Sequence, residues 1–571
     1  MKFDRDTLLG IVICAAILFG WEPLARHLGW LPPKTAPAAT APAAPATPQP
    51  APAEQAPTPA AAVQSQETPP SPAAPVAVPA AKVLEHAPLA IGNADMTLTV
   101  NAVSGEITSI LFKKYQNSAK TAPLDIDIAR GNRGALGVSA DSGTWQPDAI
   151  RSAGSADGSG KLVREVLTDG GRIVVTQEWK CGKSGYCTDF SLTLRNEGAA
   201  PVRVPNLTVN GGCLGTWQAV SGDKVRLPSH RLDYMTADKT HKDVKADKKD
   251  ADFFEGGSPS VRWAAVSNKY FCLILDGGKN PFTLSRGRFY SGEGKDAVPF
   301  ISVNAAIPTF DLAPGTEKAF SFKLYSGPKI LRLIDEFDPS AGKVMHLAWG
   351  PLDYLARLML WILVKLHALT GNYGISIILL TLLVRILFYP VTARGNASMK
   401  KMQSIQPKIK ELREKYKDNP QLMNTKMMEL YRTEGVNPFG GCLPILLQIP
   451  VFFALYATLE GAVELRQSSF LWCRDLAAAD TVAHVFSLPI NPLVLAMTAL
   501  MMLQQRMTPM SGDPMQKKMM MIMPLIMLFF FYSLPSGLTL YWTVSNIFSI
   551  IQLRLQQRGG KNNVATDAAK N

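Results

Sequence analysis

Several residue patterns that would point to an enzyme are missing from this chain. Residues 88–340 contain no metal-ligand cluster, nucleophile elbow or glycine-rich phosphate loop, which argues against the common hydrolase and nucleotide-binding classes. Residues 32–82 have very few large apolar side chains, so they cannot bury enough surface to offset the entropy of ordering. The apolar segments from residue 485 onward contain no Asp or Glu, so a buried cation there would find no acidic partner.

The chain divides into two halves of opposite character. Residues 1–340 are mostly polar and rich in turn residues, whereas residues 345–556 hold long apolar stretches, and the formal net charge is +13. The N-terminus carries Lys2 and Arg5 and then an apolar run, Thr7–Trp21, without a small-x-small cleavage site after it. We therefore predict an uncleaved transmembrane signal anchor over residues 1–24, with a cleaved signal peptide as the alternative. A disordered Pro/Ala-rich linker follows over residues 25–87.

Residues 88–340 show short alternating runs separated by Gly, Asn, Asp and Pro. This period-two pattern predicts a large antiparallel β-sandwich on the exported side of the membrane. Cys181 and Cys187 flank a predicted turn between two strands, and in an oxidising compartment they form a possible disulfide. The scattered histidines His86, His230 and His241 are interpreted as solvated surface residues, and no metal site is expected.

The second half predicts a helical membrane core over residues 371–558. Residues 345–370 are apolar on one side and interrupted by charges, which favours an amphipathic interfacial helix, although a further span is the alternative. Five apolar runs follow, which with the signal anchor make six spans: Tyr373–Ala393, Cys442–Ala462, Asn491–Arg506, Met519–Leu534 and Ser536–Ile551. The distribution of Lys and Arg places the N-terminus and the tail, residues 559–571, in the cytoplasm. Of these, Asn491–Arg506 and Met519–Leu534, the fourth and fifth spans of the six, are short for a normal bilayer, and Met519–Leu534 is rich in Met.

The basic segment between the second and third spans, residues 394–436, is predicted to lie in the cytoplasm. Its apolar residues recur at steps of three and four, which indicates an antiparallel helical hairpin with a narrow apolar seam. Its basic outer face suits phosphate groups or anionic headgroups, but without interleaved aromatic residues it predicts no specific nucleic-acid site.

Arg385 is the most informative residue of the membrane half. A guanidinium in an apolar span costs at least ~2.5–3.5 kcal/mol unless it is solvated or paired, so it marks a candidate functional site. Snorkelling to the headgroups and pairing to an acid are the alternatives. Two polar stripes suggest a shared hydrophilic cavity, with Gln448 as a further buried amide: Thr381, Arg385, Tyr389 and Thr392 on the second span, and Ser536, Thr539, Thr543 and Asn546 on the sixth. Trp542 is expected beside the second stripe, with Tyr541 pointing elsewhere.

Three long segments carry a family resemblance: ISIILLTLLVRILFYPVTARGNASMKKMQSIQPKIKELREKY, EGVNPFGGCLPILLQIPVFFALYATLEGAVELRQSSF and DPMQKKMMMIMPLIMLFFFYSLPSGLTLYWTVSNIFSIIQ. Together with the domain order, they resemble the YidC-type membrane protein insertases of the Oxa/YidC/Alb family, in the Gram-negative form with a large periplasmic domain. The resemblance implies a non-enzymatic insertase and chaperone of the cell inner membrane. It would act on nascent membrane proteins, alone or with the Sec translocon (SecYEG and SecDF), and bind ribosomes only weakly, without a cofactor.

The resemblance also implies roles for particular residues. Arg385 matches the family's groove arginine, Thr381 the polar residue one turn before it, and Tyr541-Trp542 the position of a substrate-contacting aromatic. The resulting candidate groove consists of Arg385, Thr381, Tyr541, Trp542, Thr539, Thr543 and Gln448. The hairpin would recruit substrate, with Met399, Lys400, Lys401, Met402, Lys408 and Met427 as its candidate residues. Two rival hypotheses are a secondary transporter, which would require internal repeats that are not seen here, and an exported glycan- or peptide-binding module with a membrane anchor.

Overall fold

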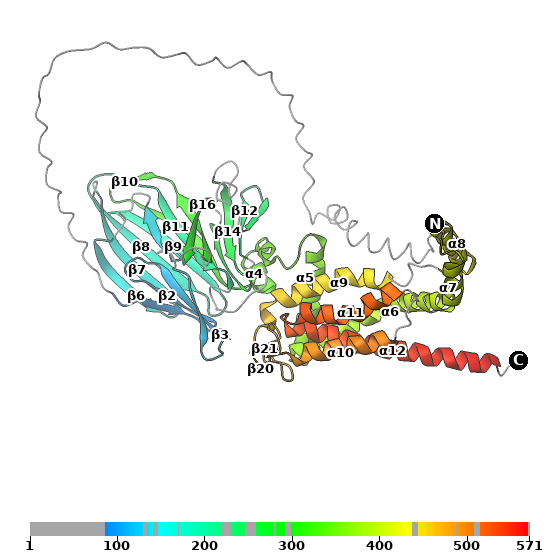
Figure 1. Cartoon of the computed structure of the whole chain (residues 1–571). Helices are drawn as coiled ribbons and strands as arrows, with labels where there is room; N and C mark the ends of the chain where they lie inside the picture. The colour runs from blue at the N-terminus through cyan, green and yellow to red at the C-terminus, as the bar shows by residue number, and fades with distance from the viewer. Residues whose placement is uncertain are drawn as a thin grey trace, which may run out of the picture. The chain divides into compact units, whose positions relative to one another are not determined.

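The computed structural model describes residues 86–568 (Figure 1), apart from 130–133, 141–146, 169–170, 218–229, 246–257, 279–280, 292–297, 437–442, 487 and 508–513. The predicted signal anchor and nearly all of the predicted linker lie outside the described residues. A β-rich part comes first in the sequence, and helices follow it.

The β-rich part consists of antiparallel strands in which alternate side chains face a common core. In β9 (Cys187–Asn196), Phe190, Leu192 and Leu194 are buried while the residues between them are more exposed. The other strands are β1 (Leu89–Gly92), β2 (Met96–Val100), β3 (Ile107–Gln116), β4 (Pro123–Asp127), β5 (Val138–Ala140), β6 (Ala149–Ala156), β7 (Ser159–Thr168), β8 (Gly171–Cys181), β10 (Val202–Val204), β11 (Leu207–Gly215), β12 (Arg231–Thr236), β13 (His241–Lys245), β14 (Ser260–Ser267), β15 (Phe271–Asp276), β16 (Phe282–Ser291), β17 (Val298–Ile307), β18 (Phe310–Leu312) and β19 (Glu317–Pro328).

Two sheets pack against each other in this part, as the sandwich prediction requires. Strands β1-β2-β3-β4 form the smaller sheet, and a 13-stranded sheet has the main order β5-β11-β17-β16-β14-β15-β19-β9-β8-β7-β6. Phe112 of the smaller sheet meets Phe271 of the larger one at a ring-centroid distance of 4.8 Å. Aromatic contacts of this kind add to the burial of apolar area that holds the sheets together.

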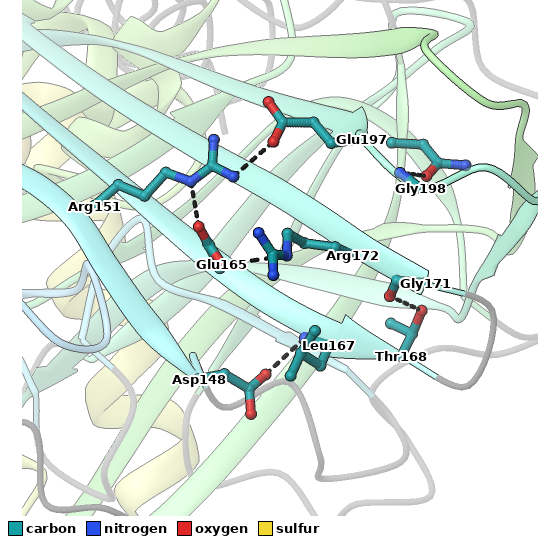
Figure 2. A network of polar contacts seen from close by, with 10 residues as sticks. Asp148, Arg151, Glu165, Leu167, Thr168, Gly171, Arg172, Glu197 and Gly198 are labelled. Carbon is teal, nitrogen blue, oxygen red and sulfur yellow. Dashed lines mark hydrogen bonds and ion pairs between the residues drawn. The ribbon is translucent and has the colours of Figure 1, made fainter.

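Ion pairs hold edge strand β6 of the large sheet to its neighbours. Edge strand β6 pairs with β7, and its Arg151 binds Glu165 and also donates to Glu197 Oε2 at 2.6 Å (Figure 2). The second oxygen of Glu165 lies 3.4 Å from Arg172 Nε on β8. The network therefore ties edge strand β6 to β7, β8 and the residue that follows β9.

The possible disulfide between Cys181 and Cys187 is not formed, because both residues are free thiols. The strand register explains this. Cys181 lies opposite Thr188, so Cys187, one residue away, points to the other face of the sheet. Cys181 is accordingly buried and Cys187 exposed.

The surface interpretation of the three histidines is right only for His86, which is exposed. His230 is buried, and its Nε2 lies 2.8 Å from the carbonyl oxygen of Leu214. His241 is largely buried beside Asp233. Neither position could be recognised locally, because each contact joins residues from different strands or loops.

The chain passes from the sheets to the helices through α4 (Leu331–Phe337) and a 3-10 helix, η4 (Ala341–Met345). The helices that follow are α5 (Pro351–Thr370), α6 (Tyr373–Ser404), α7 (Gln406–Lys415), α8 (Pro420–Thr433), α9 (Leu443–Gly461), α10 (Pro492–Met507), α11 (Pro514–Phe531) and α12 (Ser536–Ala568). A second short 3-10 helix, η5 (Val463–Leu465), and a small hairpin of β20 (Ala483–Val485) and β21 (Leu488–Ile490) connect α9 to α10.

Local sequence fixes the junction between α5 and α6. Gly371 ends α5 in the left-handed region, with φ of 67°, where glycine carries no steric cost. The side chain of Asn372 then accepts hydrogen bonds from the backbone N–H groups of Gly374 and Ile375 and so caps α6. The two helices can therefore reverse direction within two residues, and they pack against each other.

Large apolar side chains are exposed on several helices. By length and apolarity, α6 is the one described helix that could cross a membrane, and the Met521–Phe531 part of α11 is a shorter apolar helical stretch. Exposed apolar residues also lie on α9, α10 and α12, which indicates an apolar environment around the bundle. Examples on α5, α6, α9, α10, α11 and α12 are Trp361, Ile386, Leu387, Phe453, Leu503, Leu525, Phe529 and Ile551.

Candidate functional site

Arg385 projects from α6 towards α12. Its guanidinium donates to the hydroxyl oxygen of Ser545, through Nε at 3.0 Å and also through Nη2. Within the part of the chain that the structure describes, no acidic side chain pairs with Arg385. A neutral hydroxyl therefore holds the cation, and the full positive charge is retained.

A cavity lies beside this arginine. It is small, with a volume of about 20 Å³ available to water-sized molecules, it is partly open to the exterior, and it is lined by Val384, Arg385, Phe388, Thr392, Gln448, Val451 and Tyr541. Three of the seven predicted groove residues, Arg385, Gln448 and Tyr541, thus come together from α6, α9 and α12. Thr392, predicted on the first polar stripe, also lines the cavity, and Gln552 donates to its hydroxyl at 3.4 Å. Apolar residues share the lining, so the cavity is mixed rather than wholly hydrophilic.

The predicted second polar stripe does not face Arg385. Thr539 and Thr543 are buried and donate to the carbonyl oxygens of Pro535 and Thr539 on their own helix. At about 3.6 residues per turn, these two residues lie roughly 160° around α12 from Tyr541. Back-bonding of this kind satisfies a threonine hydroxyl without any partner across the bundle. Thr381 likewise donates to the carbonyl oxygen of Ile377 at 2.6 Å and does not line the cavity.

The expected roles of the two neighbouring aromatics are reversed. Tyr541 lines the cavity with Arg385, whereas Trp542 packs against Phe452 and Phe531 at centroid distances of 5.0 and 5.3 Å. Ser545, which sequence analysis missed, lies four residues after Tyr541 and hence on the same helix face. That spacing is the signal that could have identified it.

The hairpin residues fall into two groups. Met402 and Met427 pack against a small core of Ile405, Ile409 and Val436 between α7 and α8. Lys408 joins the two arms through an ion pair of 2.5 Å with Glu434. Met399, Lys400 and Lys401 lie in the last turns of α6, because α6 continues to Ser404 and Pro407 sits in the first turn of α7.

The methionines of α11 do not share one environment. Met521 and Met523 are 64% and 40% exposed, while Met527 packs against the core. The side chains of Met519 and Met520 lie outside the described residues. Flexible thioethers on an exposed apolar surface can adapt to varied partners.

Comparison with known families covers both parts of the chain. The model of the YidC periplasmic domain matches residues 89–362, and that of the 60Kd inner membrane protein matches residues 365–563. The chain belongs to the YidC family. The β-rich part is thus the periplasmic domain of an inner-membrane protein.

Individual YidC relatives are similar along most of the chain. A membrane protein insertase YidC from Geobacter sulfurreducens is 36% identical over 383 residues, which are 66% of this chain and 67% of that protein. One from Geobacter metallireducens is 33% identical over 500 residues, 84% of this chain and 87% of the relative. A crystal structure of an active YidC insertase with its first transmembrane domain resolved has a TM-score of 0.36 and 20% identity, covering 83% of this chain and 93% of that one.

Membership in the YidC family decides between the alternatives. Its members are membrane protein insertases and not enzymes, so neither a secondary transporter nor an anchored glycan- or peptide-binding module describes this chain.

Proposed function

We propose that this YidC chain inserts nascent membrane proteins into the inner membrane by receiving their polar segments in the cavity beside Arg385. The supporting observation is the hydrogen bond from the guanidinium to a neutral hydroxyl, that of Ser545. Because the hydroxyl does not neutralise the cation, its attraction remains available to an acidic or polar segment of an incoming chain. The cavity would lower the cost of moving that segment into hydrocarbon.

The helices around the cavity supply a second contribution. Helix α10 has 16 residues, which corresponds to roughly 24 Å of helix against a hydrocarbon core of about 30 Å. A thinner bilayer beside such a helix would shorten the polar segment's path. The driving force would be hydrophobic partitioning together with the membrane potential, worth ~2.3 kcal/mol per charge per 100 mV.

The apolar faces of the bundle give the substrate a route into lipid. On α6, Leu383, Ile386 and Leu387 are exposed, and on α9, Ile449 and Phe453. Both faces belong to helices that also line the cavity. In this proposal, a substrate's polar segment occupies the cavity while its apolar helix lies along one of these faces.

The proposed topology completes this arrangement. Six spans would place both termini in the cytoplasm, and α7 and α8 would form a cytoplasmic hairpin that recruits substrate. The Sec translocon (SecYEG and SecDF) and, more weakly, the ribosome are its proposed partners. The proposed domain limits remain 1–24, 25–87, 88–340, 345–370, 371–558 and 559–571.

Depletion in the host organism tests the insertase proposal. Small inner-membrane proteins with short translocated segments should lose protection from external protease or remain cytoplasmic after depletion. An exported soluble protein serves as the control and should mature normally. Unchanged insertion of every small inner-membrane protein would overturn the proposal.

A further inference from the structure

The periplasmic domain contains a cluster of metal-ligating side chains that the insertase function does not use. Asp233 lies on β12, His241 begins the neighbouring strand β13, and His346 follows η4. One ligand atom from each of these residues lies within 4.8 Å of the other two. The cluster thus joins two strands of the sheet to the segment that leads into α5.

The atoms of the cluster converge on one carboxylate. Asp233 Oδ1 lies 3.1 Å from His241 Nε2 and 2.5 Å from His346 Nε2. Asp233 is fully buried, and its second oxygen, Oδ2, has no hydrogen-bond partner among the described residues. A buried carboxylate oxygen without a partner is costly, and a bound cation is one way of offsetting that cost.

We propose that Asp233, His241 and His346 bind a divalent transition-metal ion of the zinc class. Two imidazole nitrogens and one carboxylate oxygen are a common ligand set for such an ion, with solvent completing the coordination. Bonds of ~2.0–2.2 Å in a tetrahedral site separate the ligand atoms by about 3.3–3.5 Å. Both separations from Asp233 Oδ1, 3.1 Å to His241 Nε2 and 2.5 Å to His346 Nε2, are shorter than this, so both imidazoles would move away from the carboxylate, His346 further.

The backbone holds these ligands in place. Asp233 pairs with Asp243 on β13 and with Ala265 on β14, so its position within the sheet is fixed on both sides. His346 adopts a left-handed conformation with φ of 40° and ψ of 54°, which few residues other than glycine occupy. Such a conformation persists only where the surroundings offset its cost, and a metal bond to the imidazole would contribute to that.

The site would fasten the end of a segment that is already anchored at its start. Arg262 of β14 binds Asp338, and Trp263 Nε1 donates to Ser340 Oγ at 2.8 Å. His346 lies six residues further along the chain, and α5 begins at Pro351. A bound ion would therefore fix the whole segment from 338 to 346 on the sheet and reduce the freedom of the chain entering α5.

Zinc binding to the full-length protein tests the proposal directly. The protein is purified in detergent with an affinity tag that contains no histidine, stripped with a chelator, and titrated with Zn²⁺ by calorimetry and by competition with a chromophoric chelator. We expect one ion per chain for the wild type and at least a tenfold weaker affinity for His346→Gln and Asp233→Asn. His86→Gln, which removes an exposed histidine outside the cluster, should bind like the wild type.

Two further measurements keep the result interpretable. If Asp233→Asn fails to fold, His241→Gln replaces it, because His241 is more exposed than Asp233. Zinc should also slow proteolytic cleavage between residues 338 and 350 in the wild type and in His86→Gln, but not in His346→Gln. Equal zinc binding by the wild type and the cluster variants would place the ion elsewhere, for example on a free cysteine, and would overturn the proposal. Absence of binding by the stripped wild type would also overturn it.

Discussion

Replacing Arg385 by alanine should impair insertion selectively. The substitution removes the cation from the cavity but leaves Gln448, Tyr541 and the apolar lining in place. Substrates with an acidic translocated segment should be inserted much more slowly, whereas those with a neutral segment should lose little. The selectivity follows because the proposed contribution of Arg385 is electrostatic attraction and not shape.

The magnitude can be bounded from the surroundings of the guanidinium. A pair of unit charges 4 Å apart gains about 4 kcal/mol at an effective dielectric constant near 20 and about 1 kcal/mol in bulk water. The cavity lies between these limits, because it is open to the exterior but partly lined by valine and phenylalanine. A loss of about 1.4–2.8 kcal/mol corresponds to a roughly 10- to 100-fold lower insertion rate for the acidic substrate.

Two companion variants separate charge from positioning. Arg385→Lys keeps the charge but not the two-donor contact with Ser545, so it should retain most of the activity. Ser545→Ala removes the acceptor while leaving the cation, and it should change insertion by no more than about fivefold, since one hydrogen bond contributes about 1 kcal/mol. Arg506→Ala is the control, because it removes an equal charge from an exposed position on α10.

Reconstituted proteoliposomes provide the assay. A short single-span substrate is synthesised in vitro with either an acidic or a neutral translocated tail, and insertion is scored by protection of the tail from protease. If Arg385→Ala slowed both substrates equally, or neither, the electrostatic argument would be refuted. An effect of Arg506→Ala as large as that of Arg385→Ala would also refute it.

Two further predictions concern regions outside the cavity. Burial raises the pKa of Glu464 in η5 to about 7, so the stability it contributes is fully present below about pH 4.5 and is lost as the pH rises to 7. Glu464→Gln should therefore stabilise the protein at pH 8 by up to about 3 kcal/mol and have little effect at pH 4.5, as measured by thermal unfolding; equal shifts at both pH values would contradict this. Replacing residues 406–433 by a short Gly/Ser linker should abolish insertion but leave the protein in the membrane fraction, and full activity would exclude a recruiting role for α7 and α8.

The periodic features of the sequence predicted the structure best. Alternation in segments such as β9 predicted antiparallel sheets, since burial on one face leaves a period-two pattern. The repeating apolar residues after residue 399 include Met402 of α6 and Met427 of α8, which pack against the same small cluster of Ile405, Ile409 and Val436. In the sheets a local pattern reflects a continuous buried surface, so one sequence suffices to recognise it.

Polar contacts across the bundle could be predicted only in part. The cost of burying a guanidinium identified Arg385, but the small hydroxyl residues of α12 were misleading, because Thr539 and Thr543 bond to their own helix. The actual partner, Ser545, is indistinguishable from them by residue type. A hydroxyl on a helix can donate to a carbonyl oxygen of its own helix or bond to a side chain of a neighbouring helix. Which of the two occurs depends on the direction in which the helix turns that residue.

The proposed metal-ligand cluster could not be predicted from the sequence at all. Asp233 and His346 are separated by 113 positions in the sequence, and no spacing rule connects them. They meet because β12 lies inside the sheet and because η4 returns the chain to it. A ligand set assembled from distant segments becomes visible only once the topology is known.

The choice of a serine as the partner of Arg385 connects structure and function. An aspartate at position 545 would satisfy the guanidinium more strongly, since a charge-assisted pair exceeds a bond to a neutral group. Such a pair would also neutralise the cavity and remove its attraction for an incoming acidic segment. A hydroxyl offsets part of the cost of burying the cation while leaving its charge available. In the proposed mechanism the binding site must remain charged between substrates, and a hydroxyl partner meets that requirement.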